Sequence, residues 1–124
     1  MKYKVFQIQL TDAEVDMVNE GVQVRKHVIK SNMFGRRNAP KAAEAMELGY
    51  YDHVMTVDAK NLEDVYAVGN FMNERDLDKV EVHGQFSSVS VGDVVVDENG
   101  FAFVVDMFGF EMLPEKIEKG VKIV

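Results

Sequence analysis

The segment Ser87–Leu113 constrains the fold of this chain more than any other stretch. It reads SSVSVGDVVVDENGFAFVVDMFGFEML, in which two apolar runs, SVGDVVV and FAFVVDMF, flank the tetrapeptide DENG. Asn99 and Gly100 tolerate the positive φ that a tight hairpin connection requires. Because both runs are apolar at neighbouring positions, each strand has two apolar faces that must be covered. The segment therefore predicts a central β-hairpin that is buried on both sides.

The residues after this hairpin are predicted to remain extended. FGFEML has the composition of a strand, and we expect Gly109 to mark a bulge or a close backbone approach. Residues 113–124 are predicted to form a short charged tail, in which VKIV is a candidate final strand.

The first half of the chain begins with a strand followed by a helix. Lys2–Leu10 is rich in residues that favour strands. TDAE, starting at Thr11, matches a capping box and opens a helix that Gly21 ends. Residues 22–39 are typical of either a strand or a loose helical segment, followed by a loop, and the pattern leaves both open.

Four further elements complete the predicted order. Pro40 suits the first turn of an Ala-rich helix that stops at Gly49. The other three elements are a strand over Tyr50–Val57, a helix over residues 59–73 capped by Asn61, and a third strand over Lys79–Phe86. We therefore predict one α+β domain over residues 1–124. It has a mainly antiparallel sheet, about three helices packed on one side of it, and a C-terminal β-hairpin.

Composition limits the class of protein further. The chain has 124 residues, 47% of them hydrophobic, which is enough for the core of one domain. It has no Cys, so it has neither a disulfide nor a thiolate zinc site. Residues 1–10 alternate in polarity and no run approaches 18 apolar residues. We expect a cytoplasmic protein without a signal peptide or a membrane span.

Charge is unevenly distributed along the chain. The net charge is −7, with +1 on residues 1–60 and −8 on residues 61–124. Residues 21–43 carry six Lys and Arg and no acid. The acidic half could occupy a basic surface of a partner, although charge also serves solubility alone. These two segments are the parts of the sequence most suited to binding.

The basic segment 25–37 supplies the candidate binding residues, which are Arg25, Lys26, Lys30, Phe34, Arg36 and Arg37. The cations could contact phosphates and the Phe ring could stack on a base. An acidic protein surface would suit the same cations. The sequence pI of about 4.9 is opposite to the usual footprint of a nucleic-acid-binding protein.

No set of residues predicts catalysis or a cofactor. His27, His53 and His83 are far apart in the sequence without a paired spacing, whereas we expect a metal site to bring together at least three ligands. The serines at 87, 88 and 90 are outside any nucleophile motif and are expected to bond the backbone near the hairpin. Phosphate-binding loops and calcium-loop spacing are absent from the sequence. We therefore predict no enzyme, no metal and no cofactor.

Two stretches carry a family resemblance. TVDAKNLEDVYAVGN (residues 56–70) and FSSVSVGDVVVDENGFAFVVDMFGFEML (residues 86–113) resemble a group of small uncharacterised proteins of bacteriophages, plasmids and other mobile elements. The C-terminal signature is also similar to that of YodL-like domains. The resemblance implies a phage or mobile-element origin and an accessory role in the cytoplasm of a bacterial host. It implies no catalytic residue.

These observations together predict a non-enzymatic accessory protein that binds a macromolecular partner. We expect a host or phage protein as the partner, and nucleic-acid binding through residues 25–37 is the alternative. Eight Met and eight Phe either fill the core or, where exposed, indicate self-association, and the sequence leaves both open.

Overall fold

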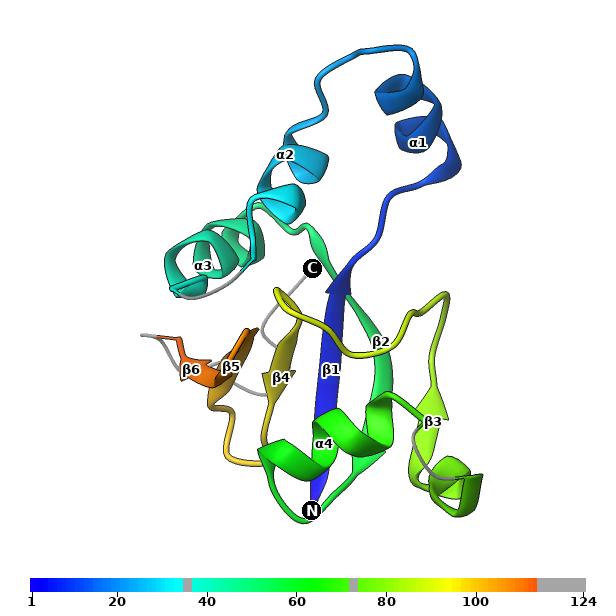
Figure 1. The fold of residues 1–124 in the computed structure, drawn as a ribbon, viewed down its shortest axis with the longest axis vertical. Coiled ribbons are helices and arrows are strands. Elements are labelled where there is room, and N and C mark those ends of the chain that lie inside the picture. The colour runs from blue at the N-terminus through cyan, green and yellow to red at the C-terminus, as the bar shows by residue number, and fades with distance from the viewer. Residues whose placement is uncertain (35–36, 72–73, 114–124) are drawn as a thin grey trace.

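The chain forms a six-stranded antiparallel sheet with the strand order β3-β2-β1-β4-β5-β6 (Figure 1). The computed structural model describes residues 1–34, 37–71 and 74–113. The strands are β1 (Lys2–Ile8), β2 (Tyr51–Asp58), β3 (Val80–Val82), β4 (Val94–Val96), β5 (Ala102–Asp106) and β6 (Gly109–Met112). The helices are α1 (Asp12–Asn19), α2 (Arg25–Ser31), α3 (Ala39–Glu47) and α4 (Leu62–Gly69), with a 3₁₀ helix at Glu74–Lys79. The predicted α+β class is confirmed.

The predicted hairpin is confirmed and lies inside the sheet. β4 pairs with β5 and also with β1, so neither of its edges is free. The Asp97 N–H donates to the Phe101 carbonyl at 3.0 Å, and Gly100 has φ 87°. All three residues of β4 are buried, as expected for a strand with two apolar faces.

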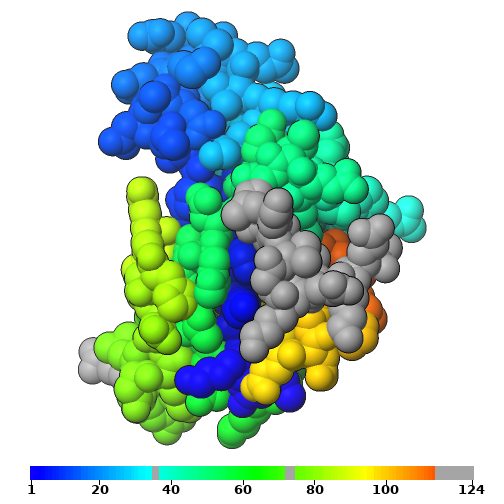
Figure 2. All heavy atoms as spheres, turned by 180° about the vertical axis from the view of Figure 1, so that it is seen from behind, coloured from blue at the N-terminus to red at the C-terminus, as the bar shows by residue number. Residues whose placement is uncertain are grey.

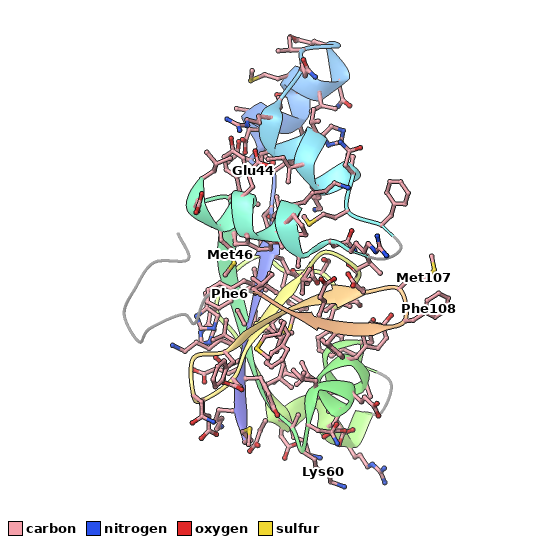
Figure 3. The ribbon with its side chains drawn as sticks, turned by 90° about the vertical axis from the view of Figure 1, so that its left-hand side faces the viewer. Phe6, Glu44, Met46, Lys60, Met107 and Phe108 are labelled. Atoms are coloured by element: carbon pink, nitrogen blue, oxygen red, sulfur yellow. The ribbon has the colours of Figure 1, made fainter. Side chains whose placement is uncertain are left out.

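Helices cover both faces of the sheet, which corrects the expectation of helices on one side. On one face, α2 and α3 pack on β1, β4 and β5, and Met46 of α3 lies near Phe6 of β1 (Figure 3). On the other face, α4 packs over β1 and β2 through Val65 and Val68 (Figure 1). The physical reason is the central hairpin itself, because a strand that is apolar on both faces exposes one of them unless a second layer covers it.

The chain reverses at Met107 and Phe108, which corrects the prediction that FGFEML continues extended. β5 and β6 pair as a second hairpin, with Asp106 opposite Gly109. Gly109 has φ 131°, so it serves the turn, and no atom lies within 4 Å of where its Cβ would be. It is therefore not a site of close backbone approach. Figure 3 shows Met107 and Phe108 at the tip of this hairpin, on the outside of the molecule.

The predicted helix boundaries are largely confirmed. The Thr11–Glu14 capping box is present in both directions, and Asn61 caps α4 through the N–H of Asp64. Residues 25–31 are helical, so of the two readings of 22–39 the strand is wrong. α4 ends at Gly69, earlier than predicted, and β3 has only three residues. The candidate strand VKIV lies outside the described residues.

Gly69 provides a test of how tightly α4 packs against the segment that precedes β4. A Cβ at this position would overlap Cγ2 of the buried Val89. We therefore expect Gly69→Ala to lower the free energy of unfolding by about 1 to 3 kcal/mol, the usual cost of overpacking. The matched control is Gly84→Ala, where no atom lies within 4 Å of the new Cβ. Urea denaturation of both variants measures this, and equal stabilities would contradict the packing at Gly69.

Candidate functional site

Residues 9–24 leave the sheet as a projection, which we call the arm. It contains the link after β1, helix α1 and the return to α2, and Figure 1 shows α1 standing away from the sheet. None of the residues of α1 is buried. Val15, Met17 and Val22 keep 40%, 41% and 45% of their surface exposed, although all three are apolar. The arm is thus a helical segment whose apolar side chains are only partly covered.

The end of α1 places two of these apolar side chains together. Gly21 adopts φ 82°, and its N–H donates to the Val18 carbonyl at 3.0 Å. The Val22 N–H donates to the Met17 carbonyl at 2.9 Å. These two bonds form a Schellman motif, which brings the residue after the glycine next to the third residue from the helix end. Met17 and Val22 therefore form one exposed apolar pair.

Lysines of α2 hold the base of the arm. Lys30 Nζ donates to the Ile8 carbonyl at 2.7 Å, and Lys26 Nζ donates to the Gln9 carbonyl at 2.9 Å. Lys26 also pairs with Glu14 of α1 at 3.1 Å. This contact and the capping bond with Thr11 lower the pKa of Glu14, the backbone bond of Thr11 being the larger cause. The two lysines thus satisfy carbonyls at the point where β1 leaves the sheet.

The predicted binding residues are distributed over several places. Lys26 and Lys30 are at the base of the arm, and Arg25 pairs with Glu44 of α3 at 2.8 Å. Phe34 is 70% exposed on the loop after α2, and Arg37 is exposed with φ 61°. Arg36 lies outside the described residues. Three of the predicted cations therefore make contacts within the protein.

The outer surface of α1 and its C-terminal cap is acidic. Asp12, Asp16 and Glu20 are exposed, and none of them forms an ion pair with the described residues. The arm has no Lys or Arg of its own. Its surface therefore combines an apolar pair with unpaired negative charge, a combination that a basic and apolar surface would complement.

A cluster of polar side chains, formed by Gln7, Asp93 and Tyr51, is buried beside the segment before β4. Asp93 is 7% exposed, and its Oδ2 accepts from Gln7 Nε2 at 3.0 Å and from the Ser90 N–H at 2.9 Å. Burial raises the pKa of Asp93 to about 7, against the lowering effects of these bonds and of Lys30. Asp93 thus bonds locally through the Ser90 N–H. The serine segment bonds Gln7 through the Ser87 carbonyl and hydroxyl, so the prediction that the serine side chains bond the backbone is not confirmed.

Tyr51 completes this buried polar group, which borders a small cavity. Its hydroxyl donates to the Gly92 carbonyl at 2.6 Å, and burial raises its pKa. The cavity has about 40 Å³, enough for one or a few water molecules, and is lined in part by Gln7, Lys30 and Asp93. A substrate the size of a nucleotide does not fit there. We interpret this group as an internal support of the hairpin.

Two histidines that are distant in the sequence meet on the sheet. The rings of His53 and His83 have centroids 4.5 Å apart, and both Nε2 atoms contact the Thr56 hydroxyl. Spacing along the chain does not reveal this pair, because it depends on the register of β2 with β3. Across the described ranges, no three His, Cys, Asp or Glu side chains gather as metal ligands.

None of the helices in the described part of the chain has the length and apolar character needed to cross a bilayer. The comparisons with known proteins add no relative: no protein-family model, curated protein or solved structure matches this chain. The resemblance to proteins of mobile elements and to YodL-like domains therefore stays a prediction, as do the bacterial origin and the location in a host cytoplasm.

Proposed function

We propose that this chain is a non-enzymatic accessory protein that binds another protein through the arm, residues 9–24. The observation that carries the proposal is that α1 is helical although none of its residues is buried. An isolated helix of eight residues is only marginally stable in water, and most helices in proteins are stabilised by packing. A partner that covers α1 would supply the packing that this helix lacks.

The exposed apolar surface of the arm is sufficient to contribute to binding. Val15, Met17 and Val22 each keep about two-fifths of their surface in contact with water. Complete burial of each would contribute roughly 1 kcal/mol, because full burial of such a side chain contributes about 1.5 to 3 kcal/mol. A short amphipathic helix that lies in an apolar groove is a common mode of protein recognition.

Charge indicates which groove would suit the arm. Asp12, Asp16 and Glu20 lie on the same arm as the apolar residues and have no ion-pair partner among the described residues. We infer that the partner presents an apolar groove bordered by Lys or Arg. A host or phage protein is the first partner to test, in line with the resemblance described above.

The internal contacts of the basic segment favour protein binding over nucleic-acid binding. Arg25 pairs with Glu44, and Lys26 pairs with Glu14. Lys26 and Lys30 also donate to backbone carbonyls at the end of β1. Nucleic-acid binding depends on cations that are available to neutralise phosphates. Phosphates would first have to displace the internal contacts of these three residues. The acidic arm would also repel a nucleic acid.

The arm is tested by reversing its chemistry. We expect Met17→Lys with Val22→Lys to remove the binding of the partner, because both changes place charge on the apolar pair. The matched control is Leu77→Lys with Val82→Lys, which alters apolar residues of similar exposure, 52% and 47%, away from the arm. Both variants change exposed residues, so both should keep the circular dichroism spectrum of the parent protein.

The measurement is affinity capture from a lysate of the host, followed by titration of the purified captured protein. The proposal requires a protein that binds the parent chain and the control variant and binds the arm variant at least tenfold more weakly. Affinity should also fall as salt rises. Equal binding of that protein to the arm variant would refute the role of the arm. A gel shift of DNA or RNA by the parent chain would instead favour the basic segment.

A further inference from the structure

His53 and His83 converge on a single hydroxyl group. His83 Nε2 lies 2.7 Å from Thr56 Oγ1, and His53 Nε2 lies 3.3 Å from the same oxygen. The two Nε2 atoms are therefore no more than about 6 Å apart. Since Nε2 is a usual metal-binding atom of histidine, the relevant atoms already point toward one place.

The register of the sheet produces this convergence. β2 and β3 are antiparallel, with Thr56 opposite Glu81, and the His83 N–H donates to the Val54 carbonyl at 2.9 Å. His83, two residues after Glu81, consequently projects from the same face as Thr56. This face is the one opposite α4, and Figure 2 shows residues of β1 and β2 reaching the surface there.

One ring is held in place and the other is accessible. His53 is half-buried and stacks on Phe6, with ring centroids 5.0 Å apart and an interplanar angle of 29°. His83 is exposed. Burial lowers the pKa of His53, and the charges of His83 and Lys4 lower it further. Metal ions bind imidazole through an unprotonated ring nitrogen, and the held ring of His53 directs Nε2 toward Thr56.

We propose that His53 and His83 bind one divalent transition metal ion of the Zn²⁺, Ni²⁺ and Cu²⁺ class. Imidazole nitrogen suits these ions, whereas Mg²⁺ and Ca²⁺ prefer oxygen ligands. No third strong ligand from the described residues joins the pair, so water fills the other positions. The bound ion would connect β2 to the chain just after the short edge strand β3.

Metal binding requires the two histidine nitrogens to approach each other. A tetrahedral zinc ion with Zn–N bonds of about 2.0 Å holds two nitrogens roughly 3.3 Å apart. The two Nε2 atoms lie 3.3 and 2.7 Å from one oxygen, so movement of the exposed His83 ring has to close the distance that remains between them. The Thr56 hydroxyl now lies between the two nitrogens, and its side chain would rotate to admit the ion.

Two neighbouring charges act on the pair in opposite directions. Lys4 disfavours positive charge on His53, and Glu81 favours it. A divalent cation at the same place experiences the same two charges. We therefore expect Lys4→Gln to strengthen metal binding a few-fold and Glu81→Gln to weaken it a few-fold, without a change of ligands.

The test is a titration with Zn²⁺ alone, followed by NMR of the imidazole carbon-bound protons. The signals of His53 and His83 should shift together with one ion per chain, and thermal unfolding should move to a higher temperature because the ion binds the folded state. His83→Ala should lower Zn²⁺ affinity at least tenfold. His27→Ala is the matched control and should leave it unchanged, because His27 contacts Ser31 on α2 and has no second histidine beside it.

Three outcomes would overturn the site. They are a Zn²⁺ affinity that His83→Ala leaves unchanged, a shift of His27 as large as that of the pair, and an equal response to Mg²⁺. Since His83 is exposed, its replacement is not expected to unfold the chain. A loss of binding in that variant is therefore a loss of the ligand.

Discussion

Val94→Asp is expected to cost about 5 kcal/mol or more, which is comparable with the entire stability of a small domain. Val94 has no exposed surface and contacts the core formed with α2 and α3. An Asp at this position loses the burial of the valine and places a carboxylate among apolar side chains without a partner. We expect the variant to be unfolded or largely unfolded at 25 °C, as measured by circular dichroism and calorimetry.

Val82→Asp is the matched control for this substitution. It makes the same chemical change on an edge strand, where Val82 is 47% exposed, and it should cost about 1 kcal/mol or less. Replacement of Glu98 in the hairpin turn by Ala should also leave the protein folded. The Glu98 carboxylate accepts a hydrogen bond from the Lys2 N–H at the surface, where water can replace it. A folded Val94→Asp variant with the thermal stability of the parent would disprove the central position of β4.

The stability of the parent protein is expected to fall as pH rises from about 4 to 7, because of Asp93. Its pKa is about 7 in the folded protein against 3.8 for an unperturbed carboxyl. The folded state therefore holds the proton more tightly than the unfolded state does. Between these two values, folding stability decreases with pH by about 1.4 kcal/mol per unit, and it is constant above pH 7. The full difference is up to about 4 kcal/mol.

Asp93→Asn isolates this contribution because the amide does not ionise. The difference in unfolding free energy between the variant and the parent should increase in favour of the variant from pH 5 to about pH 7 and level off above it. Urea denaturation at each pH unit measures it, and the slope is independent of any constant cost of burying the amide. His53, with a lowered pKa, changes stability with the opposite sign but equally in both proteins. Parallel curves would mean that Asp93 titrates as an ordinary carboxyl.

Local signals in the sequence identified most of the elements correctly. The Thr11–Glu14 capping box, the Asn61 cap and the Asn99-Gly100 turn each depend on residues within four positions of one another. Their geometry is therefore visible in a short window. The turn at Met107 and Phe108 was missed because neither residue is a usual turn former. The glycine that serves this turn follows the pair.

The sites could not be predicted in the same way because they depend on register and on distant backbone groups. His53 and His83 meet because β3 pairs with β2 in the observed register and because the β1–β2 pairing shifts register between Val5 and Phe6. Lys26 and Lys30 looked available for a ligand, yet they contact carbonyls at the end of β1. A carbonyl that needs a donor leaves no mark in a sequence, so a basic segment that supports the fold is easily taken for a binding surface.

The pairing of β1 with β4 also has a consequence for how the protein is made. Lys4 lies opposite Val96, so the middle of the sheet joins one segment to another that is synthesised much later. At usual rates of synthesis, elongation between these residues takes on the order of ten seconds. During that time β1 can pair only with β2, and its other edge is open on the ribosome. Nascent chains should therefore depend on chaperones most strongly just before β4 emerges.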